Sequence, residues 1–355
     1  MRLKQRRGNM ADGSVISQGR FLHLGQVVVD FSLMIDHLPE RGGDIFASRS
    51  SVSAGGGYNV LYAARKVGAR AVYAGAIGDG PMAEIACSSL AQIGVEAVGA
   101  RIEGVDTGIS VAMTEPNGER TFVSTRGAET MVPHDFYENL EVSDSDVVYL
   151  SGYSFSHADN RTAIERFAKK YAGRKGTALF DVGPMVADIS DESIEAITLL
   201  HPIWSVNERE SAILAKRFGI AEKTAETGDF ATECKALALA VKSKFLLRAG
   251  SQGAWFYDGS SRKEDDEVLA IPTLRVKPVD TNGAGDAHSG ALCAALLAGY
   301  SLEESLKLAN CAGALSTEHY GPATCPSMSE LVEAAAALKL VASVILASVK
   351  VVCPY

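Results

Sequence analysis

Between residues 146 and 218, short apolar runs alternate with amphipathic segments, and this alternation restricts the fold more than any other feature. The runs that fit buried strands are 146–150, 178–181 and 203–206, and the segments that fit helices are 160–171, 193–199 and 208–218. Strands that alternate with helices form a parallel sheet with helices on both faces. The same patterns predict strands at 71–77, 245–248 and 254–257, and helices at 60–67, 81–93, 287–298 and 302–317.

A small β-sheet lid is predicted beside this layered core. Residues 107–127 alternate around Asn117-Gly118, which is a strong hairpin turn signal. Residues 36–53 carry turn residues and short alternating segments that fit the same lid. The apolar run from His23 to Asp30 predicts a buried strand with Asp30 at its carboxyl end, where open α/β sheets bind ligands.

Composition narrows the class of protein. The chain has 355 residues, of which 47% are hydrophobic and 22% charged, as in ordinary globular proteins. Its formal net charge is −9, from 34 Lys and Arg against 43 Asp and Glu, which argues against a nucleic-acid partner. The 6 cysteines form no C-x-x-C pair, so no zinc or redox motif is present, and a reducing cytoplasm is the simplest location.

Both ends of the chain fall outside the predicted domain. Residues 1–19 are basic but have no apolar core, so we interpret them as a disordered extension and not as a signal peptide. Residues 341–355 belong to an apolar tail that Lys339 and Lys350 interrupt, which excludes a confident membrane span. The pattern assigns no role to this tail.

The string DTNGAGDAHSG, at 280–290, carries the clearest chemical signal. A Gly-Ala-Gly turn lets backbone N–H groups approach an anion, and the helix that follows adds its positive dipole end. Asp286 would repel a phosphate there unless it accepts a proton from a hydroxyl that attacks that phosphate. The alternative is an acid that stabilises a helix start by about 0.3–1 kcal/mol.

Two further strings each have a structural and a functional interpretation. AGGGYN, at 54–59, fits a flexible strand-to-helix loop or a substrate-binding loop. NERE, at 207–210, fits a helix start in which Asn207 and Glu210 form a capping-box pair. Neither glycine run fits a dinucleotide-binding motif, because the first lacks the G-x-G-x-x-G spacing and the second contains Asp286.

Together the three strings, in this order and spacing, resemble the motifs of the ribokinase-like, or PfkB, carbohydrate kinase family over roughly residues 20–340. The resemblance implies a doubly wound α/β/α sandwich with a small β-sheet lid. It also implies an enzyme that phosphorylates sugars or nucleosides with ATP and Mg²⁺.

The resemblance also implies roles for single residues. Asp286 would be the general base, and Gly283, Ala284 and Gly285 the anion hole. The acceptor would bind Asp30, Gly56, Gly57 and Asn59. ATP would bind Asn207, Arg248, Gly250, Gly253, Asn310 and Gly321, with Glu210 holding Mg²⁺ through water. A monovalent cation, K⁺, near Asp280 and Thr281 is an option that the family analogy leaves open.

Four departures from the family pattern stand out. Arg248 replaces a small hydroxyl residue, and it fits either a phosphate contact or a surface arginine. His288 replaces a bulky aromatic, and it fits a buried, hydrogen-bonded histidine or, as the alternative, a donor that faces the substrate or nucleotide. Leu61 replaces a small residue, and the segment 77–84 lacks the usual acid and aromatic-glycine pair.

The sequence therefore predicts an ATP-dependent sugar kinase, with the specific sugar left open. One alternative is a nucleoside kinase that stacks a base on aromatic residues, the candidates being Phe46, Phe122, Tyr153 and Phe155. Another is a ligand sensor without catalysis, although binding alone does not need Asp286. Exposed lid strands favour a homodimer.

Overall fold

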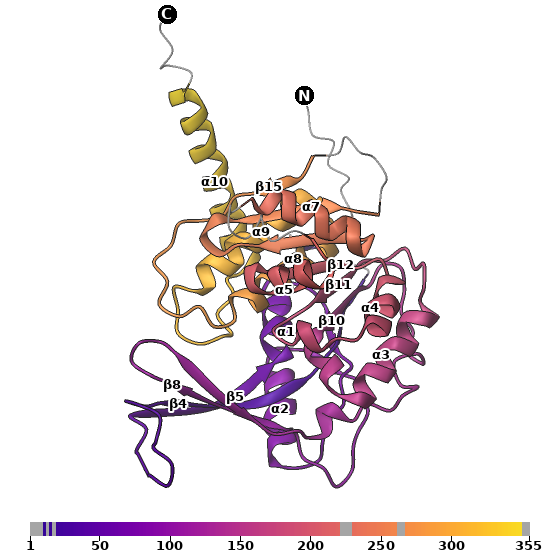
Figure 1. Cartoon of the computed structure of the whole chain (residues 1–355), viewed down its shortest axis with the longest axis vertical. Helices are drawn as coiled ribbons and strands as arrows, with labels where there is room; N and C mark the ends of the chain where they lie inside the picture. The colour runs from indigo at the N-terminus through magenta and orange to yellow at the C-terminus, as the bar shows by residue number, and fades with distance from the viewer. Residues whose placement is uncertain (1–9, 12–13, 16–18, 221–228, 261–266, 350–355) are drawn as a thin grey trace, which may run out of the picture.

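The computed structural model describes residues 10–11, 14–15, 19–220, 229–260 and 267–349. The predicted extension at 1–19 and the end of the predicted tail, 350–355, lie almost wholly outside these residues. The core is a sheet of nine strands in the order β15-β14-β13-β12-β11-β10-β3-β6-β7 (Figure 1). Their bounds are β3 Phe21–Leu24, β6 Ala71–Tyr73, β7 Glu96–Ala97, β10 Val147–Ser151, β11 Ala178–Asp181, β12 Ile203–Asn207, β13 Lys244–Arg248, β14 Ala254–Asp258 and β15 Leu269–Ile271. A separate pair, β1 Met10–Ala11 and β2 Ser14–Val15, precedes it.

The predicted parallel sheet is present, and two antiparallel strands extend it at one edge. From β7 to β13 every neighbouring pair is parallel, but β14 and β15 run antiparallel to their neighbours. The reason is the short connection at 249–253, which has room for a tight turn but not for a crossover helix. The strand β15 was not predicted.

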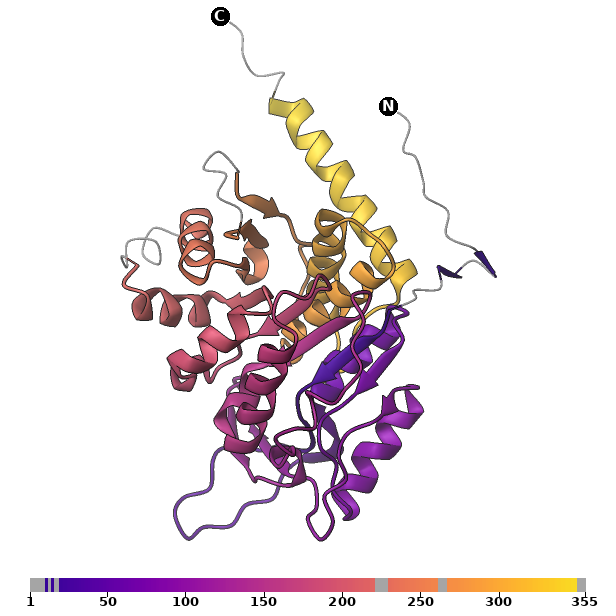
Figure 2. The same ribbon diagram turned by 90° about the vertical axis from the view of Figure 1, so that its right-hand side faces the viewer.

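Helices cover both faces of the sheet. Alternate residues of β13 show this arrangement: Leu246 packs into one hydrophobic core, while Phe245 and Leu247 pack into the other. The first core includes α1 Gly57–Lys66, α2 Pro81–Gln92, α8 Ala284–Leu297, α9 Leu302–Ser316 and α10 Met328–Val349. The second core includes α3 Ala158–Lys170, α4 Asp191–Thr198, α5 Glu208–Arg217 and α7 Phe230–Val241. Figure 2 shows the α8–α10 group (orange to yellow) and α3 (magenta) as separate layers.

Most predicted helices and strands agree with the structure within a few residues. The helix α7 was not predicted. Its first residues follow the undescribed segment 221–228, and Asp229 caps it by accepting from the N–H of Thr232 at 3.1 Å. Its last residue is followed by Lys242 in the left-handed region, with φ 49°.

A four-stranded sheet in the order β5-β4-β8-β9 forms the lid. Its strands are β4 Val27–Met34, β5 Arg49–Gly56, β8 Ile109–Thr114 and β9 Arg120–Ser124. The predicted hairpin is confirmed: β8 and β9 are antiparallel, and Asn117 Oδ1 accepts from the N–H of Glu119 at 2.8 Å. Figure 1 shows β4, β5 and β8 extending away from the helices.

The prediction of one strand from His23 to Asp30 was wrong. The main-sheet strand β3 ends at Leu24, and β4 of the lid begins at Val27. Between them Gly25 packs against His23, where an added Cβ would lie 2.6 Å from the imidazole Cε1. The sequence pattern does not reveal this break, because β3 and the first residues of β4 are both apolar although they belong to different sheets. Asp30 therefore lies on a lid strand and not at the carboxyl end of a core strand.

The last helix, α10, projects from the body of the molecule (Figures 1 and 2). Its first turns pack on the core through Leu331. Among the described residues, no helix combines the length and apolarity that crossing a membrane requires.

Candidate active site

Asp286 lies in the first turn of α8, directly after a turn in which Gly283 has φ 76°. The left-handed conformation suits glycine, and an added Cβ there would lie 2.2 Å from the carbonyl oxygen of Pro322. The first N–H groups of a helix lack intrahelical partners, so those of Gly285 and Asp286 are available to an anion. Burial, with the charge of Asp181 as a second cause, raises the pKa of Asp286 to about 7.

The carboxylate of Asp286 is tied to the glycine loop. Asn59 Nδ2 donates to Asp286 Oδ2 at 3.2 Å, which joins α1 to α8. Gly290 makes this approach of the two helices feasible, because an added Cβ would lie 2.5 Å from the Val60 carbonyl oxygen and 2.6 Å from Ala63 Cβ. The structure thus brings together two predicted site residues from opposite ends of the chain.

The glycine loop leads from β5 into α1 and carries the other predicted acceptor residues. Gly56 precedes the helix with φ 59°, and Gly57 donates its N–H to the Gln26 carbonyl at 2.7 Å. Gly55 lies directly against the Asp30 side chain, because an added Cβ would be 1.9 Å from Asp30 Oδ2. Asp30 therefore lies over the loop.

The charge of Asp30 also acts on Asp286. Burial raises the pKa of Asp30 to about 6. Its charge is one of the contributions that raise the pKa of Asp286. The two carboxyl groups and Asn59 thus lie close enough for their charges and hydrogen bonds to affect Asp286.

Arg248 points into this site and is not a surface arginine, since its side chain is only 14% exposed. Its Nη2 donates to Asp181 Oδ1 at 3.3 Å and lies 4.0 Å from Glu210 Oε2. Its Nη1 lies against Gly285, where an added Cβ would be 2.6 Å away. The positively charged guanidinium of Arg248 therefore lies beside the turn that precedes Asp286, the proposed base.

Asp181 is a site residue that the sequence analysis missed. It is the last residue of β11, and Ser289 Oγ of α8 donates to its Oδ2 at 2.8 Å. The sequence did offer one signal for Asp181, which is its position at the carboxyl end of the predicted strand 178–181. Open α/β sheets bind ligands at the carboxyl ends of their strands. Asp181 links Arg248 to α8 and raises the pKa of Asp286 through its charge.

Asn207 and Glu210 form the predicted capping box at the start of α5. The Glu210 N–H donates to Asn207 Oδ1 at 2.9 Å, and the Asn207 N–H donates to Glu210 Oε2 at 2.9 Å. Burial is the main cause that raises the pKa of Glu210. Two carboxylates, Asp181 and Glu210, thus flank the single guanidinium of Arg248, a donor set that fits a hydrated Mg²⁺ ion accompanied by phosphates.

The other residues predicted to bind ATP differ in how exposed they are and in what they contact. Gly250 is exposed with φ 48°, and Gly253 packs against Ile271, where an added Cβ would lie 2.3 Å from the carbonyl oxygen. Asn310 is buried, and its amide donates to the carbonyls of Ile271 and Pro272 at 3.1 and 3.0 Å. This side chain holds β15 against α9 and presents no free donor to a ligand.

His288 is buried and hydrogen-bonded, as predicted. Its Nε2 lies 3.1 Å from Asn310 Oδ1. Burial lowers the pKa of His288 to about 3, so the ring is neutral and Nε2 donates to the amide oxygen. Its place in α8 therefore stabilises helix packing.

The loop at Gly321, a predicted ATP-binding residue, and the turn before α8 meet at Asp280. The N–H of Gly321 donates to Asp280 Oδ2 at 3.0 Å, and the N–H of Asn282 donates to Oδ1 at 2.9 Å. Arg120 of the lid strand β9 forms an ion pair with the same carboxylate. Thr281 is exposed.

The aromatic residues proposed to stack on a base are not equivalent. Phe155 is buried and packs edge-on against Phe180, so it belongs to the core. Tyr153 is 52% exposed, and its pKa is raised by burial and by the charges of Asp286, Glu210, Asp181 and Asp30. Phe46 and Phe122 of the lid segments are 95% and 56% exposed. Of the four, Tyr153 is the one on which the charges of these carboxylates act.

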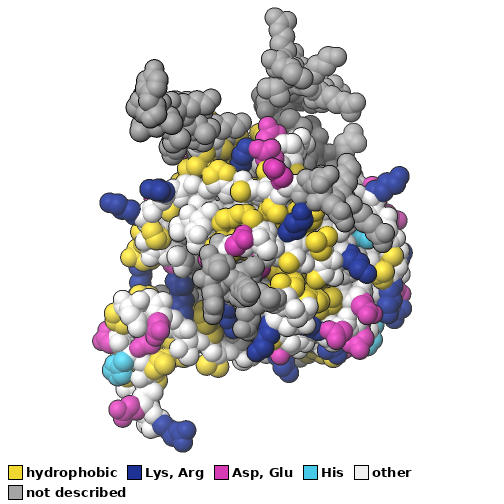
Figure 3. Space-filling view, turned by 45° about the horizontal axis from the view of Figure 1, so that its top comes forward, with side chains coloured by type: hydrophobic (Ala, Val, Ile, Leu, Met, Phe, Trp, Pro, Cys, Tyr) yellow, Lys and Arg dark blue, Asp and Glu magenta, His cyan; other side chains and the backbone are white. Residues whose placement is uncertain are grey.

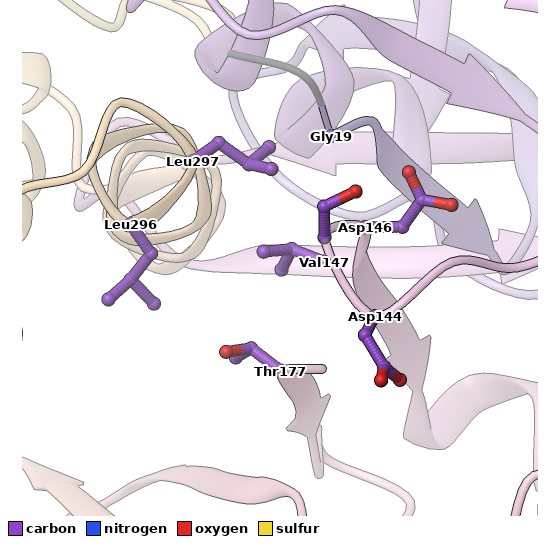
Figure 4. A pocket seen from close by; sticks show the side chains of 8 residues that line it. Gly19, Asp144, Asp146, Val147, Thr177, Leu296 and Leu297 are labelled. Carbon is purple, nitrogen blue, oxygen red and sulfur yellow. The ribbon is translucent and has the colours of Figure 1, made fainter. Parts of the chain in front are cut away.

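Two cavities lie away from this site. One, of about 290 Å³, is lined by residues including Asp144, Val147 and Thr177 at the amino ends of β10 and β11 (Figure 4). The other, of about 770 Å³, lies around α2 with Glu84 and Arg101 among its lining residues. Neither contains a predicted site residue. Basic and acidic side chains are interspersed on the face in Figure 3.

A layered α/β sandwich with a β-sheet lid over its ligand-binding edge is the architecture of ribokinase-type phosphotransferases. Residues 20–329 match the sequence profile described as pfkB family carbohydrate kinase. The chain therefore belongs to the pfkB family of carbohydrate kinases, enzymes that transfer a phosphoryl group to a sugar hydroxyl.

Comparisons with individual proteins agree with this assignment. The chain is 30% identical over 309 residues to the uncharacterized sugar kinase YegV of Escherichia coli K12, covering 87% of this chain and 91% of the relative. Ribokinase from Thermotoga maritima shares the fold with a TM-score of 0.73 at 21% identity, covering 88% of this chain and 98% of the other. Arabidopsis thaliana ribokinase complexed with ribose and ATP has a TM-score of 0.71 at 21% identity, with 89% and 98% covered. Adenosine and nucleoside kinases also share the fold.

Proposed function

We propose that this protein is an ATP-dependent sugar kinase that transfers the γ-phosphoryl group to a hydroxyl of a pentose or hexose, with Asp286 as the general base. The observation that carries the proposal is the hydrogen bond between Asn59 and Asp286. It joins the glycine loop, where an acceptor would bind, to the start of α8, where a phosphate would bind. A base held at the meeting point of two ligand sites suits direct transfer between them.

The reaction would use the described side chains as follows. Asp30 and Asn59 bind neighbouring hydroxyls of the acceptor, and Asp286 accepts the proton of the reacting hydroxyl. That oxygen forms a bond to the γ-phosphorus as the bond to the β–γ bridging oxygen breaks, and ADP leaves. The N–H groups of Gly285 and Asp286 stabilise the charge on the transferring group.

Charge near the triphosphate would be balanced by the Arg248 site. Arg248 would donate to phosphate oxygens. To do so, its guanidinium must give up the hydrogen bond to Asp181. Asp181 and Glu210 would hold Mg²⁺ through its water ligands, and Mg²⁺ supplies neutralisation of phosphate charge when bound. Asn207 positions Glu210 through the capping box. The glycines at 250, 253 and 321 shape the backbone around the nucleotide.

A nucleoside acceptor is the second candidate, and Tyr153 is the observation that favours it. Its half-exposed ring beside the catalytic carboxylates offers a face on which a base could stack. A non-catalytic sensor is the third candidate. A sensor would have no use for Asp286, a carboxylate with a pKa of about 7 beside the proposed phosphate site.

An ADP-release screen with Mg²⁺-ATP distinguishes these functions. The panel contains free pentoses, hexoses, sugar acids, sugar phosphates and nucleosides. Turnover of a free sugar supports the proposal, and turnover of nucleosides alone replaces it with the second candidate. If ATP binds and no compound is phosphorylated, the sensor becomes the better description.

A homodimer through the lid is part of the same proposal. The outer strands β5 and β9 have open edges, and Val52, Phe122 and Val123 on them are exposed. Light scattering of the purified protein gives the oligomeric state, and a monomer at micromolar concentration would exclude this contact.

A further inference from the structure

The lid and the phosphate-binding turn are joined by one ion pair. Arg120 of β9 donates from Nη2 to Oδ1 of Asp280, three residues before the anion hole begins. Both side chains are largely withdrawn from solvent, with 24% of Arg120 and 12% of Asp280 exposed. Partial burial strengthens such a pair relative to one on the open surface.

Asp280 already has three donors, one of which carries the positive charge that a monovalent cation would supply. Besides Arg120, its two oxygens accept from the N–H groups of Asn282 and Gly321 at 2.9 and 3.0 Å. Burial alone would raise the pKa of Asp280, but these donors and the guanidinium keep the pKa below its ordinary range. A K⁺ ion beside this carboxylate would lie against the positive charge of Arg120 and be repelled by it.

The backbone of Thr281 is likewise engaged inside the protein. Its carbonyl oxygen accepts from the N–H of Ala284 at 3.4 Å, within the turn itself. The residues that the family analogy associates with K⁺ therefore do not fit that ion in this chain. The charge that a bound ion would provide is already present on a side chain of the lid.

We propose that Arg120 replaces a monovalent cation at Asp280 and couples the lid to the nucleotide site. Through this one carboxylate, Arg120 contacts the turn before the anion hole and the loop at Gly321. Lid position and nucleotide binding are then linked, and the enzyme needs no K⁺. The inference rests on the proposed function, because it assumes that this turn and loop bind ATP.

The lid offers a matched control. Arg120, Thr114, Met34 and Arg49 form one cross-strand row that spans the four strands. Arg49 is the exposed residue at the opposite end of that row, on β5. Arg49→Ala thus removes the same charge from the same sheet without affecting Asp280.

The test measures ADP affinity by calorimetry, and turnover, in KCl and in tetramethylammonium chloride of equal ionic strength. For the wild type and Arg49→Ala, both quantities should agree between the two salts within about two-fold. Arg120→Ala should lose about ten-fold in ADP affinity in tetramethylammonium chloride, because a charge-assisted contact is removed. K⁺ should restore most of that loss, an effect that a merely structural role would not produce.

Four results would overturn the inference. A wild type that K⁺ activates strongly, or an Arg120→Ala variant that matches Arg49→Ala in both salts, would exclude the replacement while leaving the kinase intact. A variant whose loss K⁺ does not restore would give Arg120 a structural role only. If the wild type binds no ADP in either salt, the proposed function fails, and this inference fails with it.

Discussion

Asn59 and Asp286 are 227 residues apart in sequence, yet the Asn59 amide donates to the Asp286 carboxylate at 3.2 Å. The bond stabilises the ionised form of a carboxyl group that burial and the charge of Asp181 would otherwise keep protonated. The opposing effects leave a pKa of about 7, which suits a general base at neutral pH.

Replacing the base should separate binding from chemistry. Asp286→Asn keeps the size of the side chain and removes the proton acceptor, so kcat should fall by about 10²–10⁴-fold. Affinities for ADP and for the acceptor, measured by calorimetry, should change little. An unchanged kcat would exclude Asp286 as the base.

The pH dependence should report the same group. A general base acts only when deprotonated, so kcat/KM should rise with pH and level off above a pKa of about 7, the value for Asp286. Initial rates at low acceptor concentration between pH 5 and 9 measure this. A profile without an acidic limb would contradict the assignment.

Two substitutions should move that limb in opposite directions. Asp181→Asn removes a negative charge that raises the pKa of Asp286, so the limb should shift to lower pH. Arg248→Ala removes a positive charge that lowers the pKa of Asp286, so the limb should shift to higher pH. Asp144→Asn, an exposed change at the opposite edge of the sheet, is the control and should leave the limb in place. Shifts of the same sign in both variants would exclude this electrostatic account.

A change beside Asp30 should affect the acceptor alone. In Gly55→Ala the new Cβ would lie 1.9 Å from Asp30 Oδ2, so the carboxylate must move. Misplacement of a binding group on this scale lowers kcat/KM for the acceptor by about 10- to 100-fold. ADP affinity should stay unchanged. Gly43→Ala, where the new Cβ has 3.1 Å to the nearest atom, is the matched control in the lid segment. Equal kinetics of the two variants would exclude an acceptor role for Asp30.

Stability should also depend on Asp286. Its pKa in the folded protein, about 7, lies above its ordinary value of 3.8, so the folded state favours the protonated form. This contribution is complete at pH values below about 4 and is lost as pH rises through about 7. Asp286→Asn cannot ionise, and its Tm should therefore fall less than that of the wild type between pH 5 and pH 8. Parallel Tm curves for both proteins would show that Asp286 is not buried as described.

Much of the fold was predictable because it depends on local patterns. The helices and strands between 146 and 218, the Asn117-Gly118 hairpin and the capping box of Asn207 and Glu210 follow from residues close together in sequence. Periodicity and turn chemistry encode these elements directly. The errors arose where such patterns are ambiguous: the apolar run at 23–30 supplied two strands in different sheets.

The string at 280–290 and the glycine loop at 54–59 could also be recognised from the sequence, since each consists of consecutive residues. The contacts between them could not. Arg120 and Asp280 are 160 residues apart, and Asp181 and Arg248 are 67 apart. No local pattern specifies such pairs, because they depend on how the chain crosses the sheet and closes the lid.

The sequence by itself therefore determined the class of fold and the residue types available for phosphoryl transfer. Only the tertiary structure decided their surroundings: Asp30 on a lid strand, Arg248 between two carboxylates, and Arg120 on Asp280. The physical reason is that burial and opposing charges set the pKa and the partner of each side chain, and both depend on neighbours that are distant in sequence.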